Sequence, residues 1–182
     1  MSDLQSVGIE GAWLKPLVSH RDDRGAFTEC YRREFIPGMR EMLQANLSVS
    51  RAGALRGSHF HTKQTDYWTL ITGTITVGLY DLRPDSSTHG EKAELEWSAH
   101  GDPTGTLYIP PGVTHGWYAQ TDAILHYLVD QYHDPADEFG VAWDDPDVGI
   151  DWKIPAGTEP ILSERDRSNP SLSEVLRGSL SF

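Results

Sequence analysis

The 182-residue chain has only one cysteine, Cys30, which excludes an internal disulfide and a metal cluster held by several thiolates. Basic residues are also scarce: 15 Lys and Arg stand against 27 Asp and Glu, for a net charge of -12, and no stretch of the sequence gathers them. Nucleic-acid binding usually depends on a basic face. The composition therefore argues against a nucleic-acid partner.

Long apolar runs are absent as well. No stretch approaches the ~20 residues that a membrane span needs, and the mean hydropathy is -0.46. The N-terminus lacks the charged and then apolar pattern of a leader segment. We therefore expect a cytoplasmic protein with no membrane partner, folded as one domain over residues 1–182.

Aromatic residues and turn formers are plentiful, with 6 Trp, 7 Tyr, 5 Phe, 17 Gly and 11 Pro. This composition favours many short strands joined by tight turns. Strands are expected at residues 11–16, 26–31, 44–51, 67–71, 74–81, 93–97, 106–109, 115–119 and 123–132. No sustained helical period occurs between residues 44 and 132, so the sequence predicts an all-β sandwich or barrel closed by double-sheet Greek-key topology. Short peripheral helices are expected at 34–43 and after a capping box formed by Ser171 and Glu174.

The stretch from residue 53 to residue 73 contains His59, His61 and Asp66 between two glycines. Its pattern is strand, turn, strand. Because strand side chains alternate between faces, His59 and His61 should point the same way and Phe60 the other way. The two imidazoles could face solvent or share one site, and the pattern by itself leaves both open.

A second histidine segment supports a shared site. His115 follows a Pro-Pro-Gly turn at the start of an expected strand. The patterns G-x5-H-x-H-x4-D-x6-G (residues 53–73) and P-x-G-x2-H (residues 110–115) resemble the two signature motifs of the cupin superfamily. This resemblance implies a cupin jelly-roll barrel. In metal-bearing cupins, ligands occupy the positions of His59, His61, Asp66 and His115, and such a set suits Fe, Mn, Ni or Zn.

Six ordered segments resemble one branch more narrowly, the dTDP-4-dehydrorhamnose 3,5-epimerase family of nucleotide-sugar enzymes. They lie at residues 21–29, 44–46, 55–59, 109–116, 143–152 and 162–166, so the resemblance runs from about residue 20 to about residue 170. It implies a homodimeric isomerase that uses no cofactor and acts on a dTDP-4-keto-6-deoxyhexose. The implied reaction is proton abstraction alpha to the keto group, followed by reprotonation.

The same resemblance assigns roles to individual residues. His59 matches the general base, Asp166 the carboxylate paired with it, and Tyr127 the donor that returns a proton from the opposite face. The substrate-binding positions are matched by Arg24, Glu29, Gln44, Asn46, Arg56, His115, Glu138 and Arg165. Imidazole titrates near neutral pH, as a base for this reaction should. From the residues alone, Tyr127 could instead be a core aromatic and Asp166 a solvated carboxylate.

The sequence departs from the family pattern in the first histidine segment. The family has Arg-Gly-Leu-His-Tyr-Gln and then a lysine that stabilises the enolate oxygen, whereas residues 56–61 read Arg-Gly-Ser-His-Phe-His and Asp66 replaces the lysine. His133 also replaces a tyrosine near the nucleotide's base. An anion beside a developing enolate opposes catalysis by several kcal/mol unless something compensates for it.

Two alternatives follow from Asp66. A divalent ion on His59, His61, Asp66 and His115 could act as a Lewis acid, giving a metal-dependent isomerase or oxygenase in which His59 is a ligand and not a free base. Asp66 could otherwise pair with Arg56 or Lys63, leaving a barrel that binds a sugar nucleotide with weak or altered chemistry. A separate interpretation is a sugar-nucleotide-binding protein without catalysis. The sequence does not indicate which sugar or which carbon would be involved.

Overall fold

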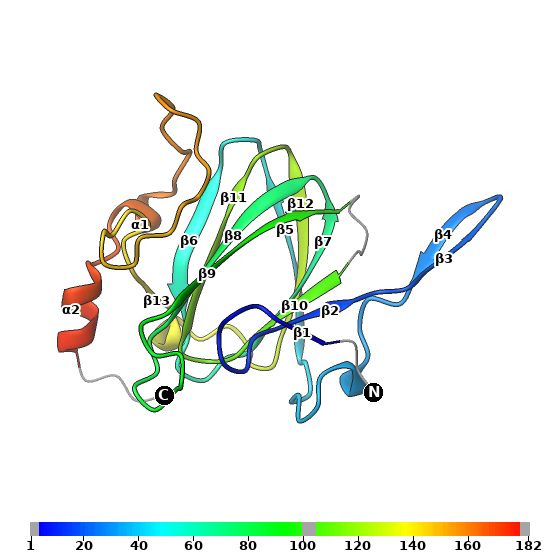
Figure 1. Ribbon diagram of the computed structural model, residues 1–182, viewed down its shortest axis with the longest axis horizontal. Coiled ribbons are helices and arrows are strands. Elements are labelled where there is room, and N and C mark those ends of the chain that lie inside the picture. The colour runs from blue at the N-terminus through cyan, green and yellow to red at the C-terminus, as the bar shows by residue number, and fades with distance from the viewer. Residues whose placement is uncertain (1–3, 100–104, 179–182) are drawn as a thin grey trace.

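Two antiparallel sheets face each other in the computed structural model, which describes residues 4–99 and 105–178 (Figure 1). The first sheet has, in spatial order, β1 (Gln5–Ser6), β2 (Trp13–Pro16), β10 (Gly105–Ile109), β7 (Asp66–Thr72), β12 (Ala123–Val129) and β5 (Gln44–Ser50). The second has β13 (Phe139–Gly140), β6 (Leu55–Phe60), β11 (Val113–Ala119), β8 (Thr74–Asp81) and β9 (Lys92–Ser98). Most successive strands from β5 onward change sheet, as in a jelly roll. The all-β prediction is confirmed.

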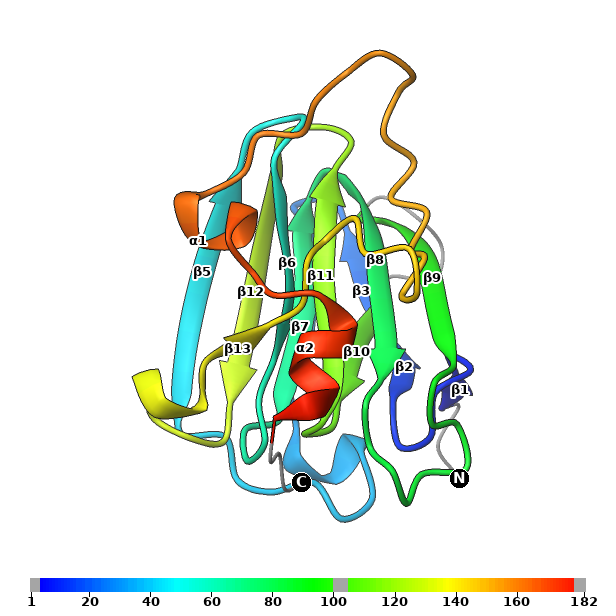
Figure 2. The same ribbon diagram turned by 90° about the vertical axis from the view of Figure 1, so that its left-hand side faces the viewer.

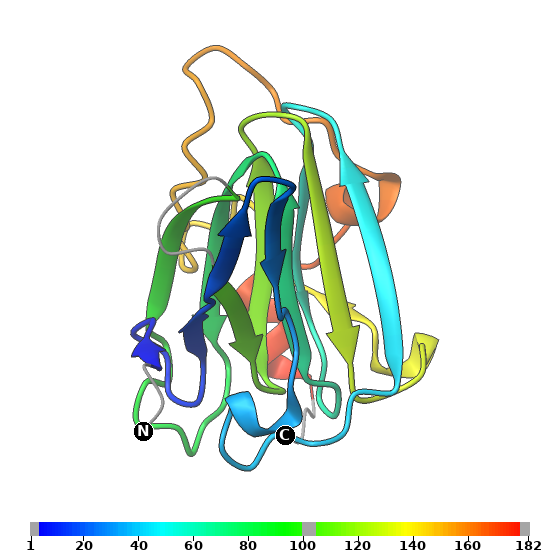
Figure 3. The ribbon, with the colours of Figure 1, turned by 90° about the vertical axis from the view of Figure 1, so that its right-hand side faces the viewer.

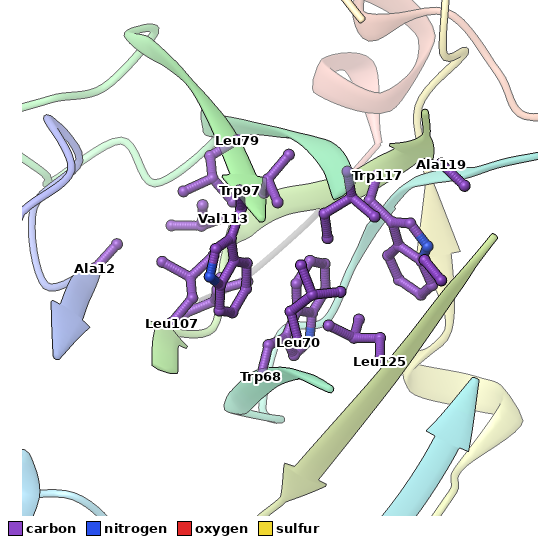
Figure 4. Close-up of a cluster of buried hydrophobic side chains, with 14 of the residues drawn as sticks. Ala12, Trp68, Leu70, Leu79, Trp97, Leu107, Val113, Trp117, Ala119 and Leu125 are labelled. Atoms are coloured by element: carbon purple, nitrogen blue, oxygen red, sulfur yellow. The ribbon is translucent and has the colours of Figure 1, made fainter. Parts of the chain in front are cut away.

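The hydrophobic core lies between the sheets and adjoins the site. Trp68 and Leu70 of β7 and Leu125 of β12 point inward, where they meet Leu79 and Trp117 of the opposite sheet (Figure 4). The rings of Trp68 and Trp117 pack edge to face with centroids 5.1 Å apart. Both tryptophans also line the cavity described below, so they form the boundary between core and cavity.

A β-bulge in β6 directs two cavity residues to the same side. His115 of β11 pairs with His59, but Trp117 pairs with Arg56, so β6 has one more residue than its partner in this interval. Arg56 and His59 are three positions apart and would face opposite sides of a regular strand. Because the bulge adds a residue, both line the cavity.

Close backbone contact makes this bulge possible. A Cβ atom on Gly57, whose φ is +147°, would lie 2.7 Å from the Cα of Gly116 on β11. Neither position has room for a side chain: a Cβ on Gly116 would lie 2.7 Å from the carbonyl oxygen of Arg56. Glycine at both positions lets the two strands approach at the bulge.

Each expected strand overlaps an observed one, but the helix expected at 34–43 is wrong. Only a 3₁₀ turn, η1 (Arg33–Phe35), forms there. Pro37 disfavours a helical conformation at the residue before it, and Gly38 has a φ of +76°, outside the helical region. Ile36 and Met39 nevertheless reach the interior by packing on Tyr67.

Two short helices lie at the C-terminal end, beside the five-stranded sheet (Figure 2). The predicted capping box is confirmed: Ser171 and Glu174 cap α2 (Leu172–Arg177), which buries Leu172 and Val175. Helix α1 (Glu164–Arg167) was not predicted, and it lies next to β6. No helix among the described residues is long and apolar enough to cross a membrane.

Strands β3 (Ser19–Asp22) and β4 (Gly25–Thr28) form a hairpin that projects away from both sheets (Figure 1). Phe27 on this hairpin is 70% exposed. Strand β5 lies at the edge of the six-stranded sheet (Figure 3). Leu47 and Val49 of this strand are also mostly exposed, and they alternate with the partly buried residues of the inward row. The described chain thus presents apolar side chains on the hairpin and on the outer surface of β5.

Candidate active site

A cavity of about 300 Å³ opens between the sheets, next to the tryptophan boundary. Side chains from both sheets, from the loop after β6 and from α1 converge on it. Its lining consists of Ser48, Arg56, His59, His61, Gln64, Asp66, Trp68, His115, Trp117, Tyr127, Glu138, Ser163, Arg165 and Asp166. The structure therefore brings the candidates of the two histidine segments together with Tyr127 and Asp166.

His59 and Asp166 form a pair at the wall of the cavity. His59 Nε2 lies 2.5 Å from Asp166 Oδ1. The Ser163 hydroxyl lies 2.8 Å from the other carboxylate oxygen, and the same Ser163 caps α1 by accepting from the Asp166 backbone N–H. Burial raises the pKa of Asp166, but the His59 and Ser163 contacts lower it more, so that the net shift is downward. Asp166 is therefore an anion that can orient the imidazole.

The burial of Asp166 could not be expected from its exposed-looking Ser-Glu-Arg-Asp-Arg surroundings. Its side chain is 5% exposed, whereas Glu164, Arg165 and Arg167 remain in contact with solvent. One local signal was present: Ser163 precedes Asp166 by three residues, which is the spacing of an N-cap and its N3 residue. The cap turns this position of the short helix toward β6.

Tyr127 projects into the cavity from the sheet opposite His59. It lies on β12, in register with Asn46 of β5 and Trp68 of β7. Burial is the main factor that raises the pKa of Tyr127, and the carboxylates of Asp66 and Glu138 raise it further. The phenol therefore keeps its proton at neutral pH, as a proton donor must.

His61 and His115 present the same ring atom to the cavity. His61 Nδ1 is 2.7 Å from the carbonyl oxygen of Asp137 in η2 (Pro135–Asp137), and His115 Nδ1 is 3.0 Å from that of Val113. A carbonyl oxygen only accepts, so each Nδ1 carries the hydrogen and each Nε2 has a free lone pair. Burial lowers the pKa of His115 to about 4, against the opposing effect of Asp66. The side chains of His59 and His61 both line the cavity, whereas Phe60 packs in a hydrophobic cluster outside its lining, as the alternation of strand side chains predicts.

Asp66 lies between the two histidines. Its Oδ2 is 3.9 Å from Nε2 of His61 and 3.9 Å from Nε2 of His115. Its carboxylate also accepts hydrogen bonds from Trp68 Nε1 at 3.1 Å and from Gln64 Nε2 at 3.2 Å. The suggested ion pair with Arg56 or Lys63 is wrong.

Arg56 is held elsewhere, because its guanidinium donates to Ser50 Oγ and to the carbonyl oxygen of Val49. It still lines the cavity beside His59. Arg165 lies at the cavity wall next to the dyad and pairs with Glu138 at 2.5 Å. These two arginines are positive groups at the cavity, available to an anionic ligand.

The remaining expected substrate-binding residues fall into two groups. Gln44 and Asn46 lie on the inward row of β5 with Ser48, and their side chains bond to each other at 2.9 Å. Arg24 and Glu29 are not near the cavity of their own chain. Arg24 is at the tip of the projecting hairpin, 90% exposed and paired with Asp22, and Glu29 pairs with Arg32.

The expected four-residue metal set is not assembled. His59 turns its Nε2 to Asp166, so it is not grouped with the other three. The ligand atoms of His61, Asp66 and His115 do lie together, all within 4.8 Å of one another. The sequence left His59 with two competing roles, general base and metal ligand. The bulge and the α1 cap direct His59 to Asp166 and away from the other three residues. A base and a three-residue cluster can therefore exist side by side.

Comparisons with known proteins find similar sequences and similar structures. The model of the dTDP-4-dehydrorhamnose 3,5-epimerase family matches residues 6–174. An enzyme of that name from Streptomyces griseus is 37% identical, covering 97% of this chain and 90% of its own. The structure of an epimerase from Mycobacterium tuberculosis superposes with a TM-score of 0.88 at 30% identity, covering 95% and 90% of the two chains. A 3'-monoepimerase from Streptomyces bikiniensis, in complex with dTDP-quinovose, gives 0.81 at 34% identity, covering 91% and 85%.

Proposed function

The chain belongs to the dTDP-4-dehydrorhamnose 3,5-epimerase family, and we propose that it epimerises a dTDP-4-keto-6-deoxyhexose. The observation that carries this proposal is the His59–Asp166 pair on one wall of the cavity with Tyr127 on the other. Epimerisation leaves the oxidation state of the sugar unchanged, so the proton transfers need a base and an acid but no redox cofactor. The single cysteine, Cys30, agrees with a cytoplasmic site of action.

In the first step, His59 removes the proton from the carbon next to the keto group. Asp166 accepts a hydrogen bond from the imidazole and stabilises the imidazolium that forms. The negative charge moves to the keto oxygen as the enolate develops. This oxygen needs a hydrogen-bond donor or a positive charge beside it. Neutral His115 supplies neither at Nε2, because its ring hydrogen is on Nδ1 and goes to the Val113 carbonyl oxygen.

In the second step, Tyr127 returns a proton to the same carbon from the other face. Inversion requires that donor and base lie on opposite sides of the sugar ring. Strands β6 and β12, which carry His59 and Tyr127, belong to the two facing sheets. A sugar held between the sheets would expose one face to each of these residues.

The substrate's diphosphate is proposed to bind the arginines at the cavity. Guanidinium groups bind phosphate oxygens in a fork geometry, so Arg56 and Arg165 suit this role. Glu138, Gln44 and Asn46 would position the sugar and the nucleoside. A cavity of about 300 Å³ suits a hexose-sized group. The nucleotide would then extend toward the exposed rim, where His133 lies 3.7 Å from Glu138.

A homodimer is proposed because one expected binding residue, Arg24, lies at the tip of the projecting hairpin and another, Glu29, directly follows it. Arg24 and Glu29 cannot act in the cavity of their own chain in this arrangement. A second copy that receives the hairpin would bring them to a site. The exposed apolar side chains of Phe27, Leu47 and Val49 support such an association.

The proposal is tested by incubating the protein in deuterium oxide with dTDP-4-keto-6-deoxyglucose and following the sugar signals by NMR. We expect deuterium at a carbon adjacent to the keto group, and its loss in a His59→Asn variant. His89→Ala, at an exposed histidine far from the cavity lining, is the matched control and should exchange normally. Binding of dTDP without exchange for any dTDP-keto sugar would overturn the enzyme assignment in favour of a sugar-nucleotide-binding protein.

A further inference from the structure

Three buried side chains converge at the cavity without taking part in the proposed dyad. The side chains of His61, His115 and Asp66 are 7%, 7% and 5% exposed. Neither Nε2 atom makes a hydrogen bond within residues 4–99 and 105–178. Two buried lone pairs and one buried carboxylate are therefore directed at the same small volume.

The contacts behind these groups are those of ligand side chains. Each imidazole donates its Nδ1 hydrogen to a backbone carbonyl, which fixes the tautomer and leaves Nε2 free to coordinate. The Asp66 carboxylate is held from behind by the Trp68 indole N–H and from the side by Gln64. All three groups are thus held in place before any ligand arrives.

A small closure brings these groups onto a single ion. Nitrogen and oxygen ligands bind transition metals at about 2.1 Å, so neighbouring ligand atoms of a tetrahedral ion lie about 3.4 Å apart. The two separations of 3.9 Å between Asp66 Oδ2 and the Nε2 atoms exceed this by about 0.5 Å. The ligand atoms of the three residues all lie within 4.8 Å of one another, so side-chain adjustments of about 1 Å suffice.

We propose that His61, Asp66 and His115 bind one divalent transition-metal ion. Two imidazoles and one carboxylate suit Fe, Mn, Co, Ni or Zn, whereas Mg and Ca prefer all-oxygen sites. Three protein ligands leave coordination positions open toward the cavity. His59 is not a ligand, because its Nε2 faces Asp166.

The site also accounts for the substitution of Asp66 for the lysine of the family pattern, a point that rests on the proposed function. An anion at this position opposes enolate formation, and imidazoles that present lone pairs to it do not reverse its charge. A bound divalent ion would supply the missing positive charge beside the keto oxygen. The base at His59 and the acid at Tyr127 keep their roles.

The test measures metal binding directly, on untagged protein stripped with a chelator and dialysed. Zn²⁺ and Ni²⁺ are titrated by calorimetry, and bound metal is counted by elemental analysis. We expect about one ion per chain and a loss of at least about tenfold in affinity for His61→Gln and for Asp66→Asn. His59→Asn and His89→Ala should bind metal as the unaltered protein does. Undiminished affinity in both ligand variants, or no uptake of either ion, would overturn the proposal.

A spectroscopic readout keeps the result independent of turnover. Trp68 donates to Asp66, and its ring centroid is 5.4 Å from that of His115, so Ni²⁺ at the site should quench part of the tryptophan fluorescence. Quenching should disappear in Asp66→Asn, with an unchanged circular dichroism spectrum as the check of folding. Quenching that persists in this folded variant would contradict the site.

Failure of this inference and failure of the proposed function have different outcomes. If metal binds to the three-residue cluster but the metal-loaded protein shows no deuterium exchange, the metal site stands and the epimerase assignment is rejected. If the chelator-treated protein takes up neither ion but still shows deuterium exchange, the epimerase assignment stands and the metal site is rejected. Asp66→Lys adds a direct comparison: it should bind no metal, and its exchange activity should be insensitive to chelator.

Discussion

His59 Nε2 lies 2.5 Å from Asp166 Oδ1, although 107 positions separate the two residues in the chain. The imidazole comes from a strand of the five-stranded sheet and the carboxylate from a four-residue helix that a serine caps. Each side chain is oriented by the other, so the base depends on both elements.

Replacing Asp166 with Asn should therefore reduce turnover strongly. The amide can still contact the ring, but it cannot stabilise the imidazolium, and we expect a loss of about 10²- to 10⁴-fold in the rate of deuterium exchange. Asp144→Asn, at an exposed aspartate outside the cavity lining, is the matched control. Exchange at the normal rate in a folded Asp166→Asn protein would show that the pair does not serve the base.

Replacing Tyr127 with Phe should separate the two proton transfers. His59 can still remove and return a proton on its own face, so exchange with deuterium should continue. Inversion should fall by about 10²-fold or more because the opposite donor is missing. NMR distinguishes the two products. Tyr80→Phe is the matched control, at a tyrosine packed near α2 and away from the cavity, and it should invert the sugar carbon at the normal rate. An equal loss of exchange and inversion in Tyr127→Phe would contradict the role assigned to Tyr127.

Mixing two inactive variants should test whether Arg24 acts in a partner's site. In a dimer of Arg24→Ala and His59→Asn chains, one of the two sites combines an intact His59 with an intact Arg24 from the other chain. We expect activity to return when the variants are unfolded and refolded together. A mixture of His59→Asn and Asp166→Asn chains has no intact site and should stay inactive. Lack of recovery in the first mixture would place Arg24 outside the partner's site.

Gly57→Ala should destabilise the fold at the bulge. The added methyl would lie 2.7 Å from the Cα of Gly116 and would impose a positive φ on alanine, for a loss of about 2 to 4 kcal/mol in the free energy of unfolding. Gly157→Ala also has a positive φ but meets no atom within 4 Å, and it should lose only about 1 kcal/mol. Urea denaturation measures both. Equal losses would show that the contact with β11 is unimportant.

Stability should fall in acid partly through Asp81. Burial raises the pKa of this carboxyl, but hydrogen bonds from Arg83, Ser86 and Thr88 lower it further, to about 2, against 3.8 in the unfolded chain. The ionised form is favoured in the folded state. Its contribution, about 2 kcal/mol, is therefore present above pH 3.8 and is lost as the pH falls toward 2.

Urea denaturation between pH 5 and pH 2 should show this loss, and Asp81→Asn should remove that part of the pH dependence. Asp85→Asn, at an exposed neighbour, should leave the profile unchanged. An identical profile for Asp81→Asn and the unaltered protein would reject the role of Asp81.

The strands were predictable because short apolar segments bounded by turns encode them locally, and the alternation around His59, Phe60 and His61 was correct for the same reason. The helix expected at 34–43 failed because Gly38 adopts a positive φ, which residue preferences alone do not specify. The shared orientation of Arg56 and His59 depends on a bulge that only strand pairing reveals. Burial of Asp166 is a tertiary effect, to which the family resemblance and the N-cap spacing from Ser163 pointed, but not the charged residues around it.

The position of α1 in the chain makes the base depend on the C-terminal segment. All strands of both sheets, and the residues of the three-residue cluster, lie before residue 141, whereas Asp166 lies beyond them and follows the bridge between Ala54 and Ile161. A truncation before residue 161 therefore removes the partner of His59 without removing a strand of either sheet or any member of the cluster.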